Sequence, residues 1–251
     1  MPACAHHYSP RMARPHFAFL ALREHPYAGE MLRQLLSGGH VPALIVEEDS
    51  DVATVEREKF LERIAGHPVA PSVREQARQH AIPTCSMPVH SSDALLEEFG
   101  DRMFDLIVLG GTRIIRGAVL SYPRDGVINS HPGLLPDCRG SASAAWSVVH
   151  DIPIGSSTHF CDENIDTGDL LLRREFAVER GMTYADLCQG TLVLAGVLMK
   201  EALTAYVAGE WPSMRTPQAE SPCPTFKNAP PEVLAVVHRK LAEQTYAHFV
   251  D

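Results

Sequence analysis

Three features that define other classes of protein are missing from this sequence. It has no run of about 18 uninterrupted apolar residues, so we expect no membrane-spanning segment. Its N-terminus lacks a basic region followed by a long apolar run, which argues against a secretory signal. Long runs of Lys and Arg are absent, and 22 basic against 31 acidic residues give a net charge of −9. This balance disfavours a polyanion such as tRNA, so we expect neither a nucleic-acid nor a membrane partner.

The cysteines are too scattered for a disulfide framework, and no two have C-x-x-C spacing. They are Cys4, Cys85, Cys138, Cys161, Cys188 and Cys223. This usage indicates free thiols in a reducing compartment, and we expect a cytoplasmic protein. Cys138 is either an exposed nucleophile or a small loop side chain, and the second interpretation is favoured.

Short apolar runs alternate with amphipathic helical patterns along the first half of the chain. Strands are expected at 17–22, 41–49, 82–88, 104–111 and 126–131. Helices are expected at 28–39, 52–64, 71–80, 91–100 and 114–121. Repeated β-α-β units of this kind predict an α/β, Rossmann-like fold, in which a mostly parallel sheet carries helices on both faces.

The second half of the chain departs from this alternation. A helical pattern at 141–150 precedes a hairpin within 154–178, and a long helix follows from Thr183. A Pro-rich linker and an amphipathic helix from about Glu232 to Phe249 form a C-terminal helical extension. We therefore expect a flexible tail at 1–15, a catalytic α/β domain at 16–212, and the linker and helix at 213–251. The terminal helix is expected to pack on its own core, and a homodimer formed through it stays open.

An amide and an imidazole stand at the end of the predicted strand at 126–131. Asn129 and His131 are two positions apart, so an extended chain points them to the same face. Gly110 and Gly111 close the neighbouring predicted strand. Parallel sheets bind ligands outside the carboxyl ends of their strands, so this edge predicts a ligand site.

A D-x-G turn within the predicted hairpin adds a carboxylate to this pair. Asn129 offers an amide N–H to a developing oxyanion, His131 exchanges a proton near neutral pH, and Asp166 is suited to orient the imidazole. Each residue alone is commonly a turn, capping or surface residue, and the prediction rests on their order and on the loop between them. The set suits acyl transfer without a covalent intermediate, because no Ser or Cys is placed as a nucleophile. A zinc site of His131, His159 and Asp166 lacks a recognisable ligand spacing, so no metal is expected.

These motifs resemble those of the folate-dependent formyltransferases. That family includes methionyl-tRNA formyltransferase, glycinamide ribonucleotide transformylase and the sugar N-formyltransferases. The similar segments are "INSHPGLLPDCRG" and "GSSTHFCDENIDTGDLL", which occur together and in the family's register. The resemblance is strong from about Phe104 to Leu172. It implies the formyltransferase fold and 10-formyltetrahydrofolate as co-substrate.

The resemblance also implies roles for individual residues. Asn129, His131 and Asp166 match the family's catalytic residues. The implied cofactor-binding residues are Leu109, Gly110, Gly111, Arg113, Ile114, Ile115, Asp162, Glu163 and Ile165. Arg113 falls where some members place an arginine on the folate glutamate.

Candidate substrate-binding residues are Arg139, Gly140 and His159. Arg139 either binds a substrate anion or caps its own loop, and a structural role for His159 is as well supported as a catalytic one. The acceptor pocket is expected from 23–27, from the loop at 136–142 and from the C-terminal helix.

The sequence departs from the family pattern at several points. Ser130 stands where an apolar residue is common, and Gly111 replaces an aromatic residue, which implies a more open pterin wall. The segment at 21–30 lacks the Gly/Ser/Asn-rich turn that cradles a phosphate in the glycinamide ribonucleotide enzyme. In the C-terminal extension at 213–251 we do not expect the β-barrel domain of the tRNA enzyme.

We therefore expect an N-formyltransferase that moves a formyl group to the primary amine of a small metabolite, such as an amino sugar or an amino-acid-like compound. The first alternative is a 10-formyltetrahydrofolate hydrolase that uses the same three residues. The second is a folate-binding protein without catalysis.

Overall fold

The computed structural model describes residues 14–250. The tail expected at 1–15 lies almost wholly outside these described residues, as does Cys4. The strands are β1 (Phe17–Leu22), β2 (Leu44–Glu48), β3 (Thr84–Met87), β4 (Leu106–Leu109), β5 (Val127–His131), β6 (Gly155–Phe160), β7 (Leu170–Glu175), β8 (Val178–Glu179) and β9 (Phe249–Val250). The helices are α1 (Pro26–Ser37), α2 (Asp51–Arg63), α3 (Val73–Gln79), α4 (Ser92–Phe99), the 3-10 helix η1 (Gly117–Ser121), α5 (Ser143–His150), α6 (Tyr184–Ala208), α7 (Trp211–Met214) and α8 (Pro231–Ala242).

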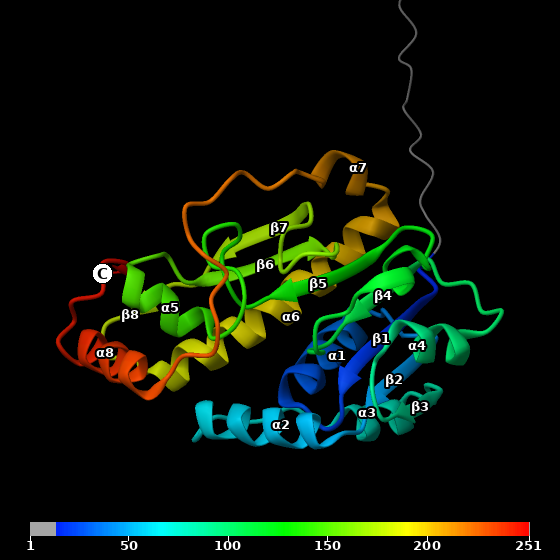
Figure 1. Cartoon of the computed structure of the whole chain (residues 1–251), viewed down its shortest axis with the longest axis horizontal. Coiled ribbons are helices and arrows are strands. Elements are labelled where there is room, and N and C mark those ends of the chain that lie inside the picture. Colours follow the sequence, from blue (N-terminus) through cyan, green and yellow to red (C-terminus); the bar gives the residue numbers. More distant parts are fainter. Residues whose placement is uncertain (1–13, 251) are drawn as a thin grey trace, which may run out of the picture.

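Seven strands form one sheet in the order β3-β2-β1-β4-β5-β6-β7 (Figure 1). The pairs from β3 to β5 are parallel, and β6 and β7 continue the sheet antiparallel. This arrangement confirms the predicted Rossmann-like, mostly parallel sheet, and the β6–β7 pair is the predicted hairpin.

Alternate side chains of β1 face two separate cores, as expected for a strand buried on both sides. Phe17 and Phe19 pack in the core that contains buried residues of α1 and α6. Ala18 and Leu20 pack in the core that contains residues of α4 and η1. Helices therefore cover both faces of the sheet (Figure 1).

The helix α6 runs along the sheet and is long and apolar enough to cross a membrane by length and composition alone. More than half of its most apolar window is buried inside the protein, and it contacts β5, β6 and α1. These contacts are those of a core helix.

The direction of the chain through the sheet reverses at β1. From β1 the chain continues to β2 and β3 on one side of β1, and it then crosses to β4 on the other side. Such a switch point leaves a crevice at the carboxyl ends of the strands. Leu22, Leu109 and His131 are the last residues of β1, β4 and β5, so they lie at this edge.

The C-terminal helix is shorter than its hydrophobic pattern predicts. It ends at Ala242 rather than near Phe249, because Gln244 has a φ of 55° and Thr245 N–H turns back to Lys240 O at 2.9 Å. Tyr246 then points inward and donates its hydroxyl to Ile152 O at 2.6 Å. The predicted extension is present, and α8 packs on α5.

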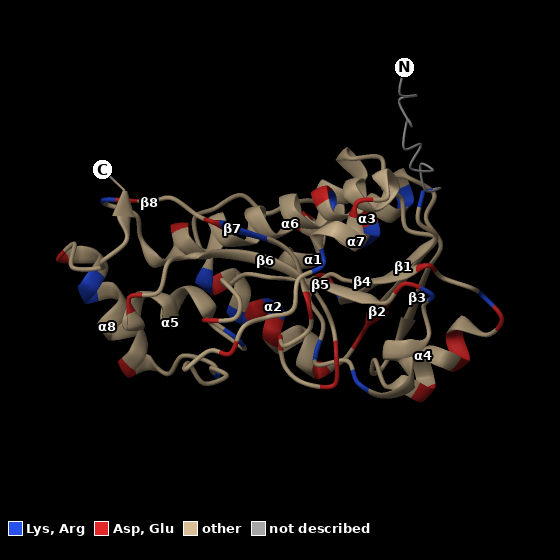
Figure 2. Cartoon of the chain, turned by 90° about the horizontal axis from the view of Figure 1, so that it is seen from above, with Lys and Arg blue, Asp and Glu red and all other residues tan. Residues whose placement is uncertain are grey.

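Charges of both signs are spread over the described part of the chain. Lys and Arg occur together with Asp and Glu on α1, α2, α3, α6, α8 and β7 (Figure 2). The basic residues are therefore not collected on one side of the described structure.

Candidate active site

A cleft of about 1120 Å³ opens at the carboxyl ends of β1, β4 and β5. Most of the predicted site residues line it, although they come from distant parts of the sequence. The predicted residues among its lining are Leu109, Gly111, Arg113, Ile114, Ile115, Asn129, His131, Gly140, His159, Asp162, Ile165 and Asp166. Gly110, Glu163 and Arg139 are not part of the lining. The strand ends and the loop after β6 therefore bring the predicted constellation into one cavity.

Asn129, His131, His159 and Asp166 form a connected polar cluster in this cleft. Asp166 Oδ2 lies 3.5 Å from His131 Nδ1, and Asp166 Oδ1 lies 3.5 Å from His159 Nε2. Asn129 Nδ2 lies 3.4 Å from His159 Nε2. The pairing of β5 with β6 sets this geometry, because it places Asn129 directly opposite His159 in the antiparallel register.

The two ring nitrogens of His131 have different partners. Nε2 lies 2.8 Å from the carbonyl oxygen of Cys138, which can only accept, so Nε2 carries a proton. Ser143 Oγ lies 3.1 Å from the same nitrogen. Nδ1 faces the Asp166 carboxylate, so both ring nitrogens are placed to carry the protons of the imidazolium form.

Asp166 is held as a carboxylate in a largely buried position. Burial of its side chain opposes ionisation, but the positive charge of His131 and hydrogen bonds from His159 and Gly140 outweigh it and hold the pKa of Asp166 well below its usual range. Gly140 N–H donates to Asp166 Oδ2 at 2.8 Å. Asp166 also has a φ of 55°, a left-handed conformation that Asp tolerates better than most residues.

His159 connects this cluster to the backbone. Its Nδ1 donates to the carbonyl oxygen of Phe160 at 2.8 Å, and its side chain is 2% exposed. Nε2 then faces Asp166 and Asn129. The structure places His159 in contact with two predicted catalytic residues, and its role stays a prediction.

The folate side of the cleft, as the resemblance assigns it, contains an ion pair that the sequence did not predict. Arg113 Nε lies 2.9 Å from Glu48 Oε1, at the end of β2. Glu48 has a fully buried side chain, and it also accepts His90 N–H at 2.9 Å and Ser50 Oγ–H at 2.8 Å. The buried Nδ1 of His90 has no hydrogen-bond partner among the described residues. Arg113 is therefore anchored by Glu48 at the cleft wall.

Two departures from the family pattern have local structural reasons. Gly111 has a φ of +82°, and a Cβ there would lie 3.1 Å from Tyr27 Cδ1, so a larger residue would be strained. Ser130 forms a 2.5 Å hydrogen bond with Thr158 across the β5–β6 pair. A polar residue at position 130 is thus satisfied inside the sheet.

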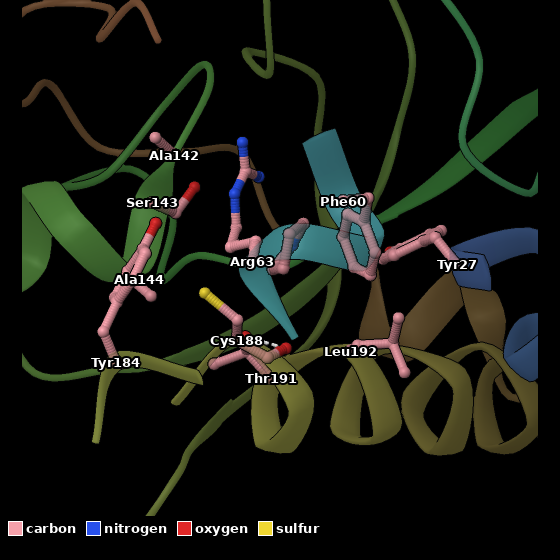
Figure 3. Close-up of a pocket in the computed structure, with 11 residues that line it drawn as sticks. Tyr27, Phe60, Arg63, Ala142, Ser143, Ala144, Tyr184, Cys188, Thr191 and Leu192 are labelled. Atoms are coloured by element: carbon pink, nitrogen blue, oxygen red, sulfur yellow. Dashed lines mark hydrogen bonds between the residues drawn. The ribbon is translucent and has the colours of Figure 1, made fainter. Parts of the chain in front are cut away.

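The opposite side of the cleft is closed by α1, α2 and the start of α5. Tyr27 donates its hydroxyl to the carbonyl oxygen of Ser130, between the two catalytic candidates of β5. A smaller cavity of about 50 Å³ continues from this side between α2 and α6 (Figure 3). Tyr27, Phe60, Arg63 and Ser143 line both cavities.

Arg139 and Cys138 contact other parts of the protein rather than the cleft. Arg139 Nη2 donates to Gln218 Oε1 at 3.3 Å, outside the cleft lining. Cys138 is fully buried, and burial raises the pKa of its thiol to about 11. Cys138 is therefore a loop side chain, as the favoured interpretation has it, and it is buried rather than exposed; its raised pKa disfavours a thiolate at neutral pH.

No motif or periodicity in the sequence indicated that several of the lining residues would belong to the site. Ser143, Phe60 and Arg63 reach the cleft only through tertiary packing. The segment 225–228 of the linker also lines it, whereas α8 contributes no described residue to the lining. Within residues 14–250 no group of three or more His, Cys, Asp or Glu side chains is arranged to hold a metal ion.

Known proteins are similar to this chain over most of its length. The family model described as formyl transferase matches residues 17–203. The methionyl-tRNA formyltransferase of Myxococcus xanthus is 29% identical over 202 residues, which covers 79% of this chain and 61% of that protein. This chain spans about half to three fifths of the length of the first curated relatives it matches.

Two solved structures share the fold. Glycinamide ribonucleotide transformylase 1 from Symbiobacterium toebii has a TM-score of 0.60 at 21% identity, over 79% of this chain and 90% of that one. The N-formyltransferase from Helicobacter canadensis, in complex with folinic acid and dTDP-3-aminofucose, has a TM-score of 0.60 at 16% identity, over 86% of this chain and 71% of that one. At these identities the likeness concerns the fold.

Proposed function

This chain belongs to the formyl transferase family, and on that premise we propose that it transfers a formyl group from 10-formyltetrahydrofolate to the primary amine of a small metabolite. The observation that carries the proposal is the contact of Asp166 with both His131 and His159, beside Asn129, at the carboxyl edge of the sheet. An amino sugar or an amino-acid-like compound is the proposed acceptor.

Each residue of the cluster has a defined task in this proposal. Asn129 donates its amide N–H to the formyl oxygen as negative charge develops there. His131, as the imidazolium, adds a positive charge near that oxygen. Asp166 holds His131 through Nδ1, accepts the proton that the attacking amine must lose and would pass it to the folate nitrogen, which leaves as its bond to the formyl carbon breaks. The acceptor amine has to arrive neutral, because an ammonium has no lone pair for attack.

The cleft fits a folate on its Arg113 side. Leu109 and Ile115 give it an apolar wall, and behind this wall the buried Nδ1 of His90 makes no hydrogen bond to a described residue and lies 4.0 Å from Glu48 Oε2. Arg113, oriented by Glu48, is the cation for a folate carboxylate. The bound folate would supply the formyl carbon. The Helicobacter canadensis protein of similar fold is in complex with folinic acid, which supports a folate as the co-substrate proposed here.

A small acceptor is supported by the charge of the chain. The net charge of −9 and the interspersed charges in Figure 2 are unfavourable for a long polyanion, although many curated relatives are named for tRNA. The acceptor side of the cleft is walled by α2 and by the linker after α7, and a cleft walled in this way suits a small metabolite.

The proposal is tested by incubating the protein with 10-formyltetrahydrofolate alone and with a panel of amino sugars and amino acids. Release of tetrahydrofolate is followed by absorbance. We expect release that depends on an amine of the panel. Rapid release without any amine would instead indicate a hydrolase, and a folate that binds without any release would indicate a non-catalytic binding protein.

A further inference from the structure

Arg63, the last residue of α2, occupies the wall between the cleft and the smaller cavity. It is half-buried and lines both, together with Tyr27, Phe60 and Ser143 (Figure 3). Its guanidinium carbon lies 5.9 Å from the centre of the Phe60 ring. No carboxylate of residues 14–250 lies within ion-pair distance of it. Arg63 is thus a cation beside the cleft whose charge is not neutralised by a described neighbour.

Together with burial, the positive charge of Arg63 lowers the pKa of His25, a buried residue on the same side of the cleft. Burial lowers the pKa of His25 to about 4, and the positive charge of Arg63 acts in the same direction. His25 is therefore neutral at physiological pH and does not compete for an anion. Its Nδ1 accepts the N–H of Tyr27 at 3.2 Å and caps α1, whose first residue is Pro26. The first N–H groups of α1 are thus either absent, at Pro26, or already bonded to His25, so this helix end does not offer them to an anion.

The other charged residues of the cleft wall leave Arg63 available. Arg113 is paired with Glu48 on the folate side, and Glu56 is paired with Lys59 at 3.1 Å. Lys227 is exposed at the rim and has no carboxylate within ion-pair distance in the described chain. Two cations without acidic partners therefore line the cleft.

The wall that carries Arg63 is connected directly to the catalytic candidates. Ser143 lines the smaller cavity, and its hydroxyl lies 3.1 Å from His131 Nε2. Tyr27 lines the same cavity and donates to the carbonyl oxygen of Ser130. The cavity holds about 50 Å³, which is room for one small group by the ~10–15 Å³ that a single water requires.

We propose that the formyl acceptor carries an anionic group, a carboxylate or a phosphate, that pairs with Arg63 while its amine lies beside His131. This inference rests on the proposed function and narrows its substrate class. A guanidinium can donate two parallel N–H bonds to either a carboxylate or a phosphate. The group recognised by Arg63 is therefore one that carries two or more anionic oxygens. Arg63 is then a specificity-determining residue.

The test compares wild type, Arg63→Gln and the control Arg57→Gln, which removes the same charge from α2 away from the cleft lining. Binding of inorganic phosphate, acetate and folinic acid is measured by calorimetry on the full chain. We expect one or both anions to bind wild type and Arg57→Gln, and to lose about tenfold or more in affinity in Arg63→Gln, because one charge-assisted pair is worth ~1.5–3 kcal/mol. Folinic acid affinity should be equal in all three proteins.

The two anions distinguish a phosphate from a carboxylate as the recognised group. Equal anion affinity in Arg63→Gln and wild type, or no anion binding by wild type that does bind folinic acid, would overturn the Arg63 site. Failure of wild type to bind folinic acid would overturn the proposed function instead, and the anion comparison would still decide the site.

The linker between α7 and α8 carries a second, independent inference, because it contacts the catalytic turn directly. Gln218 Nε2 donates to the carbonyl oxygens of Asp166 at 2.9 Å and Gly168 at 2.7 Å. Its Oε1 accepts from Arg139. One linker side chain therefore joins the Asp166 turn to the loop after β5.

Further along, the linker also fixes that loop. Phe226 N–H donates to Arg139 O at 2.9 Å, and Ser141 N–H donates to Phe226 O at 2.9 Å. The contact requires a glycine between them, because a Cβ on Gly140 would lie 2.1 Å from Phe226 O. The Phe226 ring stacks on Trp146, with centroids 5.0 Å apart. In Figure 1 the orange linker passes this loop on its way to α8.

We infer that Gln218 is a positioning residue for Asp166. The left-handed backbone of Asp166 is uncommon for a residue other than glycine, and it persists only where its surroundings fix it. Gln218 supplies that restraint from outside the cleft, while Gly140 N–H restrains the carboxylate from within. Both restraints set the contact of Asp166 with His131.

Gln218→Ala is expected to lower kcat for tetrahydrofolate release by about 10- to 100-fold, since a displacement of ~1 Å can cost that much, and to leave the KM for folate unchanged. Gln218→Glu should lose at least as much, because an ionised carboxylate cannot donate to the two carbonyls. The pH profile of kcat should shift in both variants, which a purely structural defect would not cause. The control is Glu220→Ala, an exposed position of the same linker. A kcat and pH profile in both Gln218 variants equal to those of Glu220→Ala would overturn this inference.

Discussion

Asp166→Asn removes one negative charge from the centre of the proposed site and keeps the shape of the side chain. The asparagine oxygen can still accept the Gly140 N–H. What disappears is a charge 3.5 Å from His131 Nδ1 and 3.5 Å from His159 Nε2. At an effective dielectric constant of about 20, a unit charge pair at that distance interacts by roughly 4–5 kcal/mol. The variant also lacks an acceptor for the proton of the amine.

This energy sets the expected loss of activity. Each 1.36 kcal/mol corresponds to about tenfold in rate, so kcat should fall by roughly 10³-fold, within the ~10²–10⁴ range of general acid–base catalysis. Tetrahydrofolate release is measured at saturating folate with the acceptor found in the panel. Asp169→Asn is the matched control, because Asp169 pairs with Arg215 at 2.6 Å and does not line the cleft. Turnover of Asp166→Asn within about twofold of this control would show that the Asp166 carboxylate has no such role.

Three further predictions concern the same site. Asn129→Ala should lower kcat by about 10²–10³-fold, since it removes an oxyanion donor, and unchanged kcat in the same assay would contradict the assigned role. Cys138 should resist alkylation by iodoacetamide at pH 7.5 in the folded protein, because its thiol is buried and has a pKa of about 11; a modified Cys138 in the mass spectrum of the native protein would show otherwise. The depressed pKa of Asp166 should make the protein lose stability in acid. The folded state binds its proton less readily than the unfolded state, whose pKa is about 3.9, so the contribution is present above that pH and is lost as pH falls toward the folded pKa. Urea unfolding should therefore show a smaller difference between wild type and Asp166→Asn at pH 3 than at pH 7, and a difference that grows in acid would be the contrary result.

The sheet could be predicted because its strands are recognisable from local patterns. β1 and β4 are uniformly apolar, as strands buried on both faces must be, and Gly38 and Gly100 mark the ends of two helices. The N-x-H spacing on β5 then places two side chains on one face by geometry alone. The D-x-G turn was found only through its register with that motif.

Other parts of the site depend on contacts between residues far apart in sequence. The Glu48–Arg113 pair joins the ends of β2 and β4, and Gln218 reaches Asp166 across 52 positions. Neither has a local periodicity that would reveal it. The early end of α8 is also a tertiary effect, because Tyr246 turns inward to Ile152 although the apolar pattern would allow the helix to continue.

The role of His159 illustrates the same limit. Its place on β6 follows from alternation, but its contact with Asp166 follows from the turn that returns the chain to β7. The sequence could therefore name the residue without choosing between a structural and a catalytic role. The Ser130–Thr158 pair beside it likewise explains a departure from the family pattern only once β5 and β6 are paired.

Transfer of the formyl group to an amine is best tested by following the formyl carbon itself. The protein is incubated with 10-formyltetrahydrofolate labelled with ¹³C in the formyl group, with and without the amine panel, and the products are read by NMR. We expect the label to appear as a formamide on an amine of the panel, and Asp166→Asn to abolish this signal. Label that appears only as free formate, at a rate independent of any amine, would contradict it.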